Sequence, residues 1–179
     1  MPTSKEQKNL QNHSTMRLLF ASLLILSIIK VFAQDAHIEI NSQVWKPFIK
    51  NFNGCNIPAF MAMNSKDAVR SPRDAKTIWN WDQYNKEQAA GDLEDRRLKR
   101  KRTLGLHFTE HIVNGNLVFD GGVYRTTYLL ANGKTKNYFG RFHVVMPKEK
   151  GVCKILVDTD SSQGGTIGEK EFLAGKAME

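Results

Sequence analysis

The chain has 179 residues, a length typical of one domain, and its 41% hydrophobic and 25% charged residues indicate a globular protein rather than a disordered one. The formal net charge of +8 is local, because six basic residues lie within positions 96–102 and the rest of the chain after residue 33 is almost neutral. This distribution argues against a nucleic-acid-binding surface, which needs basic groups spread along a groove or face.

Residues 18–29 form an uncharged apolar run that directly follows Arg17. The run is too short to cross a bilayer, which needs about 20 apolar residues. The segment ending at Ala33 then places small or modest side chains at the positions that signal peptidases read. The pattern predicts a removable signal peptide over residues 1–33 and a mature chain that starts at Gln34.

The first fifteen residues are polar and carry no pattern, so residues 1–15 are an extension and Met16 is an alternative initiator. A cleaved signal peptide predicts a periplasmic or secreted protein without a stable membrane span. An uncleaved N-terminal membrane anchor is the other interpretation of the same apolar run.

The two cysteines, Cys55 and Cys153, are far apart in the sequence and form no C-x-x-C motif, so a thiolate zinc site lacks its ligands. We therefore expect no metal and no cofactor. In an oxidising compartment the two residues can pair as a disulfide, or they can remain two separate thiols.

Apolar residues recur at helical spacing over residues 35–53, which predicts an amphipathic helix that stops at Asn53-Gly54. Asn56 is placed to cap a short second helix with Pro58 in its first turn. An extended piece over residues 68–70 should follow.

A third helix is expected after Asp74, which is placed to cap it. Trp79, Trp81 and Tyr84 are its large apolar residues, and Gly91-Asp92 should end it before the basic segment.

From Leu104 the hydrophobic period changes from 3.6 to 2, the period of β-strands. Asn114-Gly115 and Asn132-Gly133 are favoured pairs for two-residue hairpin turns. Helices followed by an antiparallel meander predict an α+β domain. The four expected strands cover residues 104–113, 116–130, 135–146 and 152–160.

Two-residue turns at both asparagine–glycine pairs would bring the apolar residues of three strands to one face, as a half-buried sheet requires. The residues expected on that face are Leu104, Leu106, Phe108, Glu110, Ile112, Leu117, Phe119, Val123, Arg125, Thr127, Tyr138, Phe142, Val144 and Met146. The residues expected on the other face are His107, Thr109, His111, Asp120, Tyr124, Phe139, Arg141 and His143. A bulge at Gly121-Gly122 would instead turn Tyr124 and Tyr128 inward. For the fourth strand we expect Cys153, Ile155, Val157 and Thr159 to point inward.

Three stretches carry a resemblance to a known superfamily: DAVRSP at residues 67–72, HIVNGNLVFDGGVYRTTY at 111–128, and GRFHVVMPKEKGVCKILVDTD at 140–160. Together with the helices before them, they resemble the SnoaL-like or ketosteroid-isomerase-like superfamily, whose cone fold is shared with nuclear transport factor 2. The resemblance covers residues 36–160. It departs from the family pattern at Cys153, where members often carry tryptophan.

The resemblance implies an α+β cone, in which N-terminal helices pack in the concave face of a strongly curved antiparallel sheet with a pocket at its open end. The domain would span residues 34–160, followed by a C-terminal tail over 161–179. Homodimers through the convex face are frequent in the superfamily. Its members include isomerases, dehydratases, cyclases, hydrolases and non-enzymatic binders, so the fold does not select a reaction.

The helices that should cover the concave face are rich in aromatic residues, which predicts an aromatic-lined cavity for a small apolar molecule. Ordinary core packing explains the same aromatic residues. An arginine near the mouth, Arg125, would suit an anionic group on the ligand. The expected ligand-binding residues are Trp45, Trp79, Tyr84, Arg125 and Tyr138.

Two further hypotheses name other residues. In an isomerase- or dehydratase-type enzyme, Glu110 on the apolar face would have a raised pKa and act as general base. In a non-enzymatic accessory protein, the convex face around Tyr124, Phe139 and Arg141 would form a homodimer.

The remaining polar groups have two interpretations each. His107 and His143, with Asp120 nearby, can share a ligand across the sheet or belong to a polar surface. Asp158 and Asp160 can line the mouth in an altered register or simply meet solvent. The basic run at 96–102 can contact anionic lipid, glycan or nucleic acid, or be a solvated helix end or loop.

Overall fold

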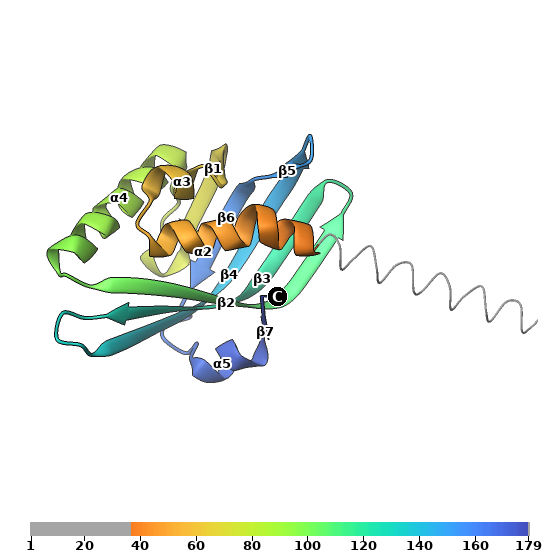
Figure 1. The fold of residues 1–179 in the computed structure, drawn as a ribbon. Coiled ribbons are helices and arrows are strands. Elements are labelled where there is room, and N and C mark those ends of the chain that lie inside the picture. Colours follow the sequence, from red (N-terminus) through yellow and green to blue (C-terminus); the bar gives the residue numbers. More distant parts are fainter. Residues whose placement is uncertain (1–36, 179) are drawn as a thin grey trace, which may run out of the picture. The chain divides into compact units, whose positions relative to one another are not determined.

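The computed structural model describes residues 37–178, which Figure 1 shows as a sheet with helices on both of its faces. The predicted signal peptide over residues 1–33 lies outside this range. Among the helices of the described residues, none combines the length and the apolar character that crossing a membrane requires.

A seven-stranded sheet organises the domain. Its strands are β1 (Asn64–Pro72), β2 (Lys101–Asn114), β3 (Leu117–Leu129), β4 (Thr135–Glu149), β5 (Val152–Cys153), β6 (Ile155–Ser161) and β7 (Lys176–Ala177). The order is β1-β6-β4-β3-β2-β7, and β5 pairs with β4. β1 runs parallel to β6, whereas the other pairs are antiparallel. The α+β class is confirmed, but the sheet is mixed, because the extended piece at 68–70 belongs to a parallel edge strand.

Helical elements lie before, between and after these strands (Figure 1). They are the π-helical segment η1 (Asn41–Trp45), α2 (Lys46–Asn53), α3 (Ile57–Met61), the 3-10 turn η2 (Arg73–Ala75), α4 (Trp81–Arg97) and α5 (Glu169–Ala174). Gly54 ends α2, and the Asn56 side chain accepts a hydrogen bond from the amide of Ala59 at the start of α3. Both caps were predicted from the sequence.

The third predicted helix differs from α4 at both ends. Asn80, not Asp74, caps it by accepting a hydrogen bond from the amide of Gln83, so Trp79 precedes the helix. The helix continues past Gly91 to Arg97, because Asp92 and Asp95 have a buried partner in Arg102 of β2. These ion pairs therefore stabilise the last turns of α4, beyond the glycine at which the sequence pattern predicts that the helix ends.

The main core lies between the N-terminal helix, which comprises residues 37–53 and includes η1 and α2, and the concave face of the sheet. The helix contributes Ile40, Val44 and Trp45, which pack on side chains from β2, β3, β4, β5 and β6. A second buried cluster joins α3 to α4 through Phe60 and Tyr84. This arrangement confirms the expected packing of N-terminal helices in the concave face.

The predicted hairpin registers are wrong by one or two residues. Asn114 pairs with Leu117, so the tight turn consists of Gly115 and Asn116, and a five-residue loop over 130–134 joins β3 to β4. The shift reverses the faces of β3. Phe119, Val123 and Arg125 consequently lie on the outer face, opposite to the prediction, while Leu106 and Val144 lie inside as expected.

A bulge in β2 completes this change of faces. Phe108 pairs with Gly122 and Glu110 with Gly121, so Thr109 has no partner in β3. On the inner side, β3 consequently presents Asp120 and Tyr124. The sequence predicts an inward Tyr124 only if β3 has a bulge at Gly121-Gly122. In the structure the bulge is in β2, where Thr109 is the extra residue.

The segment after Asp160, expected to be a tail, packs on the outer face of the sheet. Phe172 of α5 lies in a cluster with Val123, Ile167 and Phe139, and its ring stacks on His107 at a centroid distance of 3.8 Å. β7 then pairs with β2. Part of the convex face is thus covered by the chain itself.

Gly122 is the position where the bulge leaves least space. A Cβ there would clash with the carbonyl oxygen of His107 and would lie 2.9 Å from the ring of Phe142. The carbonyl belongs to the backbone of the neighbouring strand, so it cannot move aside as a flexible side chain would. Only glycine fits at this point of the sheet.

We expect Gly122→Ala to lower the free energy of unfolding by about 3 kcal/mol, because the added methyl group overpacks the bulge. Urea denaturation followed by circular dichroism measures the change. Gly91→Ala is the matched control: no heavy atom lies within 4 Å of a Cβ at this helical position, so stability should rise by about 0.5–1 kcal/mol. Equal effects of the two substitutions would contradict the assigned register.

Candidate functional site

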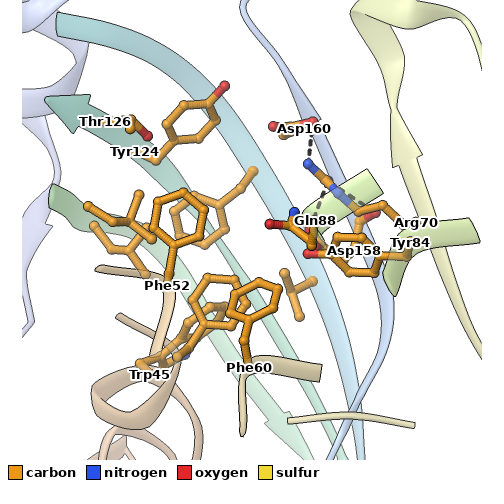
Figure 2. A pocket seen from close by; sticks show the side chains of 15 residues that line it. Trp45, Phe52, Phe60, Arg70, Tyr84, Gln88, Tyr124, Thr126, Asp158 and Asp160 are labelled. Carbon is orange, nitrogen blue, oxygen red and sulfur yellow. Dashed lines mark hydrogen bonds and ion pairs between the residues drawn. The ribbon is translucent and has the colours of Figure 1, made fainter. Parts of the chain in front are cut away.

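A cavity of about 200 Å³ lies between the N-terminal helices and the concave face of the sheet. Figure 2 shows aromatic side chains around one part of it and a cluster of polar groups at the other. The lining residues are Trp45, Phe48, Phe52, Phe60, Arg70, Tyr84, Gln88, Leu104, Leu106, Tyr124, Thr126, Phe142, Val144, Asp158 and Asp160.

The apolar wall is built from rings that hold one another in edge-to-face and tilted contacts. Trp45 lies 5.5 Å from Phe108 and 5.7 Å from Phe142, measured between ring centroids. Its indole Nε1 donates a 2.6 Å hydrogen bond to Oδ2 of the fully buried Asp120, whose Oδ1 lies 2.5 Å from Nδ1 of His111. The indole is therefore fixed by packing on its faces and by a charged acceptor at its edge.

The polar end is centred on Arg70 of β1. Nη1 lies 3.0 Å from Oδ1 of Asp158, and Nη2 lies 2.9 Å from Oδ1 of Asp160. The hydroxyl of Tyr84 donates a 3.1 Å hydrogen bond to Oδ2 of Asp158. The parallel pairing of β1 with β6, in which Arg70 is opposite Asp158, brings these groups together from positions 88 residues apart in the sequence.

Burial and charge shift the ionisation of this cluster. Burial raises the pKa of Asp158 by more than the adjacent Arg70 lowers it. For Arg70, burial alone would lower the pKa, but the carboxylates of Asp158 and Asp160 outweigh it and raise the pKa above its usual value. Burial, and then the charge of Asp158, raises the pKa of Tyr84 well above its usual value.

Tyr124 of β3 reaches the same end of the cavity from the opposite wall. Burial, followed by the charge of Asp160, raises the pKa of its hydroxyl, which therefore stays protonated at neutral pH. The ring lies over Gly140 of β4, where a Cβ would come within 2.6 Å of the Tyr124 hydroxyl oxygen. The glycine thus provides the space that the inward tyrosine occupies.

The structure places two of the five expected ligand-binding residues, Trp45 and Tyr84, on the cavity wall. Trp79 packs behind Tyr84 at a ring distance of 6.5 Å. Arg125 lies on the outer face, paired with Glu169 at 2.9 Å, because the register of β3 is shifted. Tyr138 is 46% exposed and makes an edge-to-face contact with Tyr128 instead of lining the cavity.

Glu110 does not enter the cavity. It is exposed and lies beside His143 on the outer side of Gly121, beyond the bulge. His107 stacks on Phe172 whereas His143 stacks on Phe119, and Asp120 faces the interior. The two histidines therefore keep their expected face of the sheet, Asp120 does not, and the cavity carboxylates are Asp158 and Asp160.

The convex face expected to form a dimer also changes. Tyr124 lies in the cavity, and Phe139 packs against Phe172 of α5 at a ring distance of 6.2 Å. Of the three residues named for that face, Phe139 and Arg141 keep their expected side of the sheet, and only Tyr124 does not. A homodimer remains a prediction.

Three of the six basic residues at 96–102 form ion pairs with acidic residues of α4. Arg102 is buried and paired with both Asp92 and Asp95, and Arg100 lies 2.5 Å from Asp95. Arg97 pairs with Glu94 at the end of α4.

The Cys55 sulfur and carboxylate oxygens of Asp92 and Asp95, atoms of the kind that bind metal ions, lie within 4.8 Å of one another. The guanidinium of Arg102 already binds both carboxylates. Cys55 and Cys153 are free thiols.

Solved structures show which fold this arrangement represents. A conserved protein from Planctomyces limnophilus matches with a TM-score of 0.60 at 8% identity, covering 70% of this chain and 94% of its own. A protein of the nuclear transport factor 2-like superfamily from Salmonella enterica matches with a TM-score of 0.54 at 17% identity, covering 74% and 92%. The chain has the nuclear transport factor 2-like fold.

Aln2 from a Streptomyces species is also similar, with a TM-score of 0.58 at 12% identity over 71% of this chain and 90% of its own. Structural matches at identities this low establish the nuclear transport factor 2-like fold but do not indicate an activity. No family model and no curated protein matches the sequence.

Sequence reasoning missed the residues that make the cavity polar. Arg70 lies in the DAVRSP stretch, where the sequence pattern indicates only an extended piece. Asp158 and Asp160 were named only for an altered register, and that register occurs: they pair with Val144 and Phe142 of β4, whose side chains face the cavity. Phe48 and Phe52, four residues apart on one helix, were a detectable signal for the apolar wall.

We expect Asp158→Asn to change how stability depends on pH. A carboxyl whose pKa is raised by folding takes up a proton on folding, so its contribution to stability falls as pH rises above the ordinary aspartate pKa of about 3.9. The variant lacks this loss and should gain stability relative to the parent protein with increasing pH, by at most about 1.4 kcal/mol per pH unit. Urea denaturation of both proteins between pH 4 and 7 measures the difference.

Asp67→Asn serves as the control, because Asp67 is an exposed carboxylate in the same strand as Arg70. Its stability should follow that of the parent protein at every pH. Parallel curves for Asp158→Asn and the parent would show that Asp158 keeps an ordinary pKa in the folded state.

Proposed function

We propose that this protein binds a small, largely apolar molecule in the cavity between its N-terminal helices and the concave face of the sheet. One observation carries the proposal: ring packing leaves about 200 Å³ unfilled, although aromatic side chains surround that space. An apolar cavity of about 150 Å³ is large enough to hold benzene. The proposed ligand therefore has about the size of one substituted ring.

The composition of the wall supports this size and polarity. Seven of the fifteen lining residues are aromatic, and the charged groups gather at one end instead of being scattered. Such a division orients a ligand, because its apolar part contacts the rings while a polar substituent reaches the hydrogen-bonding groups. Glu110 does not line this cavity, so an acid–base role there would belong to Asp158 or Asp160.

Fluorobenzene is a suitable probe of the apolar wall. We expect it to bind with a dissociation constant near 1 mM, equivalent to about 4 kcal/mol, as measured by fluorine NMR. Leu104→Trp should abolish binding, because Leu104 lines the cavity and the larger side chain fills it. Leu129→Trp is the matched control at a strand end where leucine is 44% exposed, and it should leave binding unchanged.

Absence of fluorobenzene binding to the parent protein, or binding that survives Leu104→Trp, would refute a ligand site in this cavity. Native mass spectrometry of protein taken from the envelope of its own host is a complementary measurement. It should show a retained molecule on the parent protein and none on Leu104→Trp.

We also propose that the protein acts in the periplasm or outside the cell. The uncharged run at 18–29, with Arg17 before it and Ala33 at the expected cleavage point, supports this location. The mature chain would start at Gln34, three residues before the described domain begins.

We expect the protein recovered from the envelope or the medium to lack its first 33 residues by intact mass. Leu24→Arg should prevent processing and keep the longer chain with the cells, because a charge in the middle of the apolar run disrupts signal recognition. Asn9→Arg, which adds the same charge to the polar extension, should be processed normally. Recovery of the unprocessed parent chain in the membrane fraction would support the anchor instead.

A further inference from the structure

We propose that the molecule bound in the cavity is an amine whose protonated nitrogen lies at the polar end and whose apolar group fills the aromatic part. This inference rests on the proposed function and specifies the chemical class of its ligand. Three features carry it: the balance of charge at the polar end, the partners of Arg70, and the rings around the remaining space.

Two carboxylates face one guanidinium at the polar end. Among the lining residues, only Arg70, Asp158 and Asp160 carry ionisable groups that are charged at neutral pH in their ordinary state. The hydroxyls of Tyr84 and Tyr124 are neutral there, because burial holds both of their pKa values above the usual one. With both carboxylates ionised, the lining therefore has an excess of one negative charge, which a ligand cation would balance.

The positive charge of Arg70 is already committed to the protein. Its Nη1 and Nη2 groups lie 3.0 Å and 2.9 Å from the two aspartates, so an anionic ligand would meet a guanidinium whose charge is compensated, next to two like charges. Asp160 is the more accessible carboxylate, with 21% of its side chain exposed against 11% for Asp158. It is the group that we expect to contact the ammonium.

The aromatic wall favours the same class of ligand. Ring faces carry negative electrostatic potential and attract ammonium groups, and the ring edges and apolar atoms accommodate a hydrocarbon part. Tyr84 and Tyr124 lie next to the two carboxylates, while Trp45 and Phe60 belong to the apolar part (Figure 2). A cavity that is acidic at one end and aromatic elsewhere is complementary to an arylalkyl amine.

Three probes of nearly equal size and different charge test the proposal: benzylamine, benzyl alcohol and benzoate. Isothermal titration calorimetry at pH 7 measures their affinities for the processed protein. We expect benzylamine to bind about tenfold more tightly than benzyl alcohol, and benzoate to show no binding. Binding of benzylamine should disappear in Leu104→Trp, which fills the cavity.

Asp160→Asn removes the accessible negative charge and keeps the shape of the side chain. The variant should lose the preference for benzylamine over benzyl alcohol. Asp67→Asn removes an equal charge from an exposed position and should keep the preference. If Asp160→Asn does not fold, the ranking of the three probes on the parent protein still decides the proposal.

The outcomes separate this inference from the function on which it rests. Equal affinities for benzylamine and benzyl alcohol, both abolished by Leu104→Trp, would overturn the amine and leave the apolar site intact. Preferential binding of benzoate would also overturn it and would assign the anchoring role to Nε of Arg70, which is buried without a hydrogen-bond partner in the described structure. Binding of none of the probes, or binding that Leu104→Trp does not affect, would overturn both proposals.

Discussion

One unpaired residue in β2 determines which side chains face the cavity. Thr109 is the extra residue between the pairs that Phe108 and Glu110 form with β3, and it changes the side to which the rest of β2 presents its residues. Glu110 consequently points out of the domain, while His111 approaches the buried Asp120. Bulges bend and twist a strand, so the same residue contributes to the curvature that makes the sheet concave.

The polar end joins stability to the candidate function. Arg70 links the edge strand β1 to β6 through two ion pairs that are largely shielded from water. A well-packed apolar set of side chains would often stabilise such a position as well as or better than buried charges do. The two aspartates together offer one more negative charge than Arg70 balances. The extra aspartate makes sense if a further positive group enters.

Local signals in the sequence predicted the class of fold, the change from helices to strands, and the caps at Gly54 and Asn56. They did not predict the site, because its polar groups come together through non-local pairing of β1 with β6. Asparagine–glycine pairs also favour a turn without specifying its position to within one residue. A shift of one residue moved Tyr124 into the cavity and Arg125 out of it.

The short elements α5 and β7 help to bury the outer face of the sheet. Phe172 covers Gly105 and His107 on the back of the sheet, and β7 extends the edge formed by β2. The two faces of β2 and β3 are thus buried by segments that precede and follow these strands in the sequence, the N-terminal helix on one side and α5 on the other. Because α5 follows β2 and β3 in the sequence, a ribosome delivers it after them, and the back of the sheet stays uncovered until α5 has emerged.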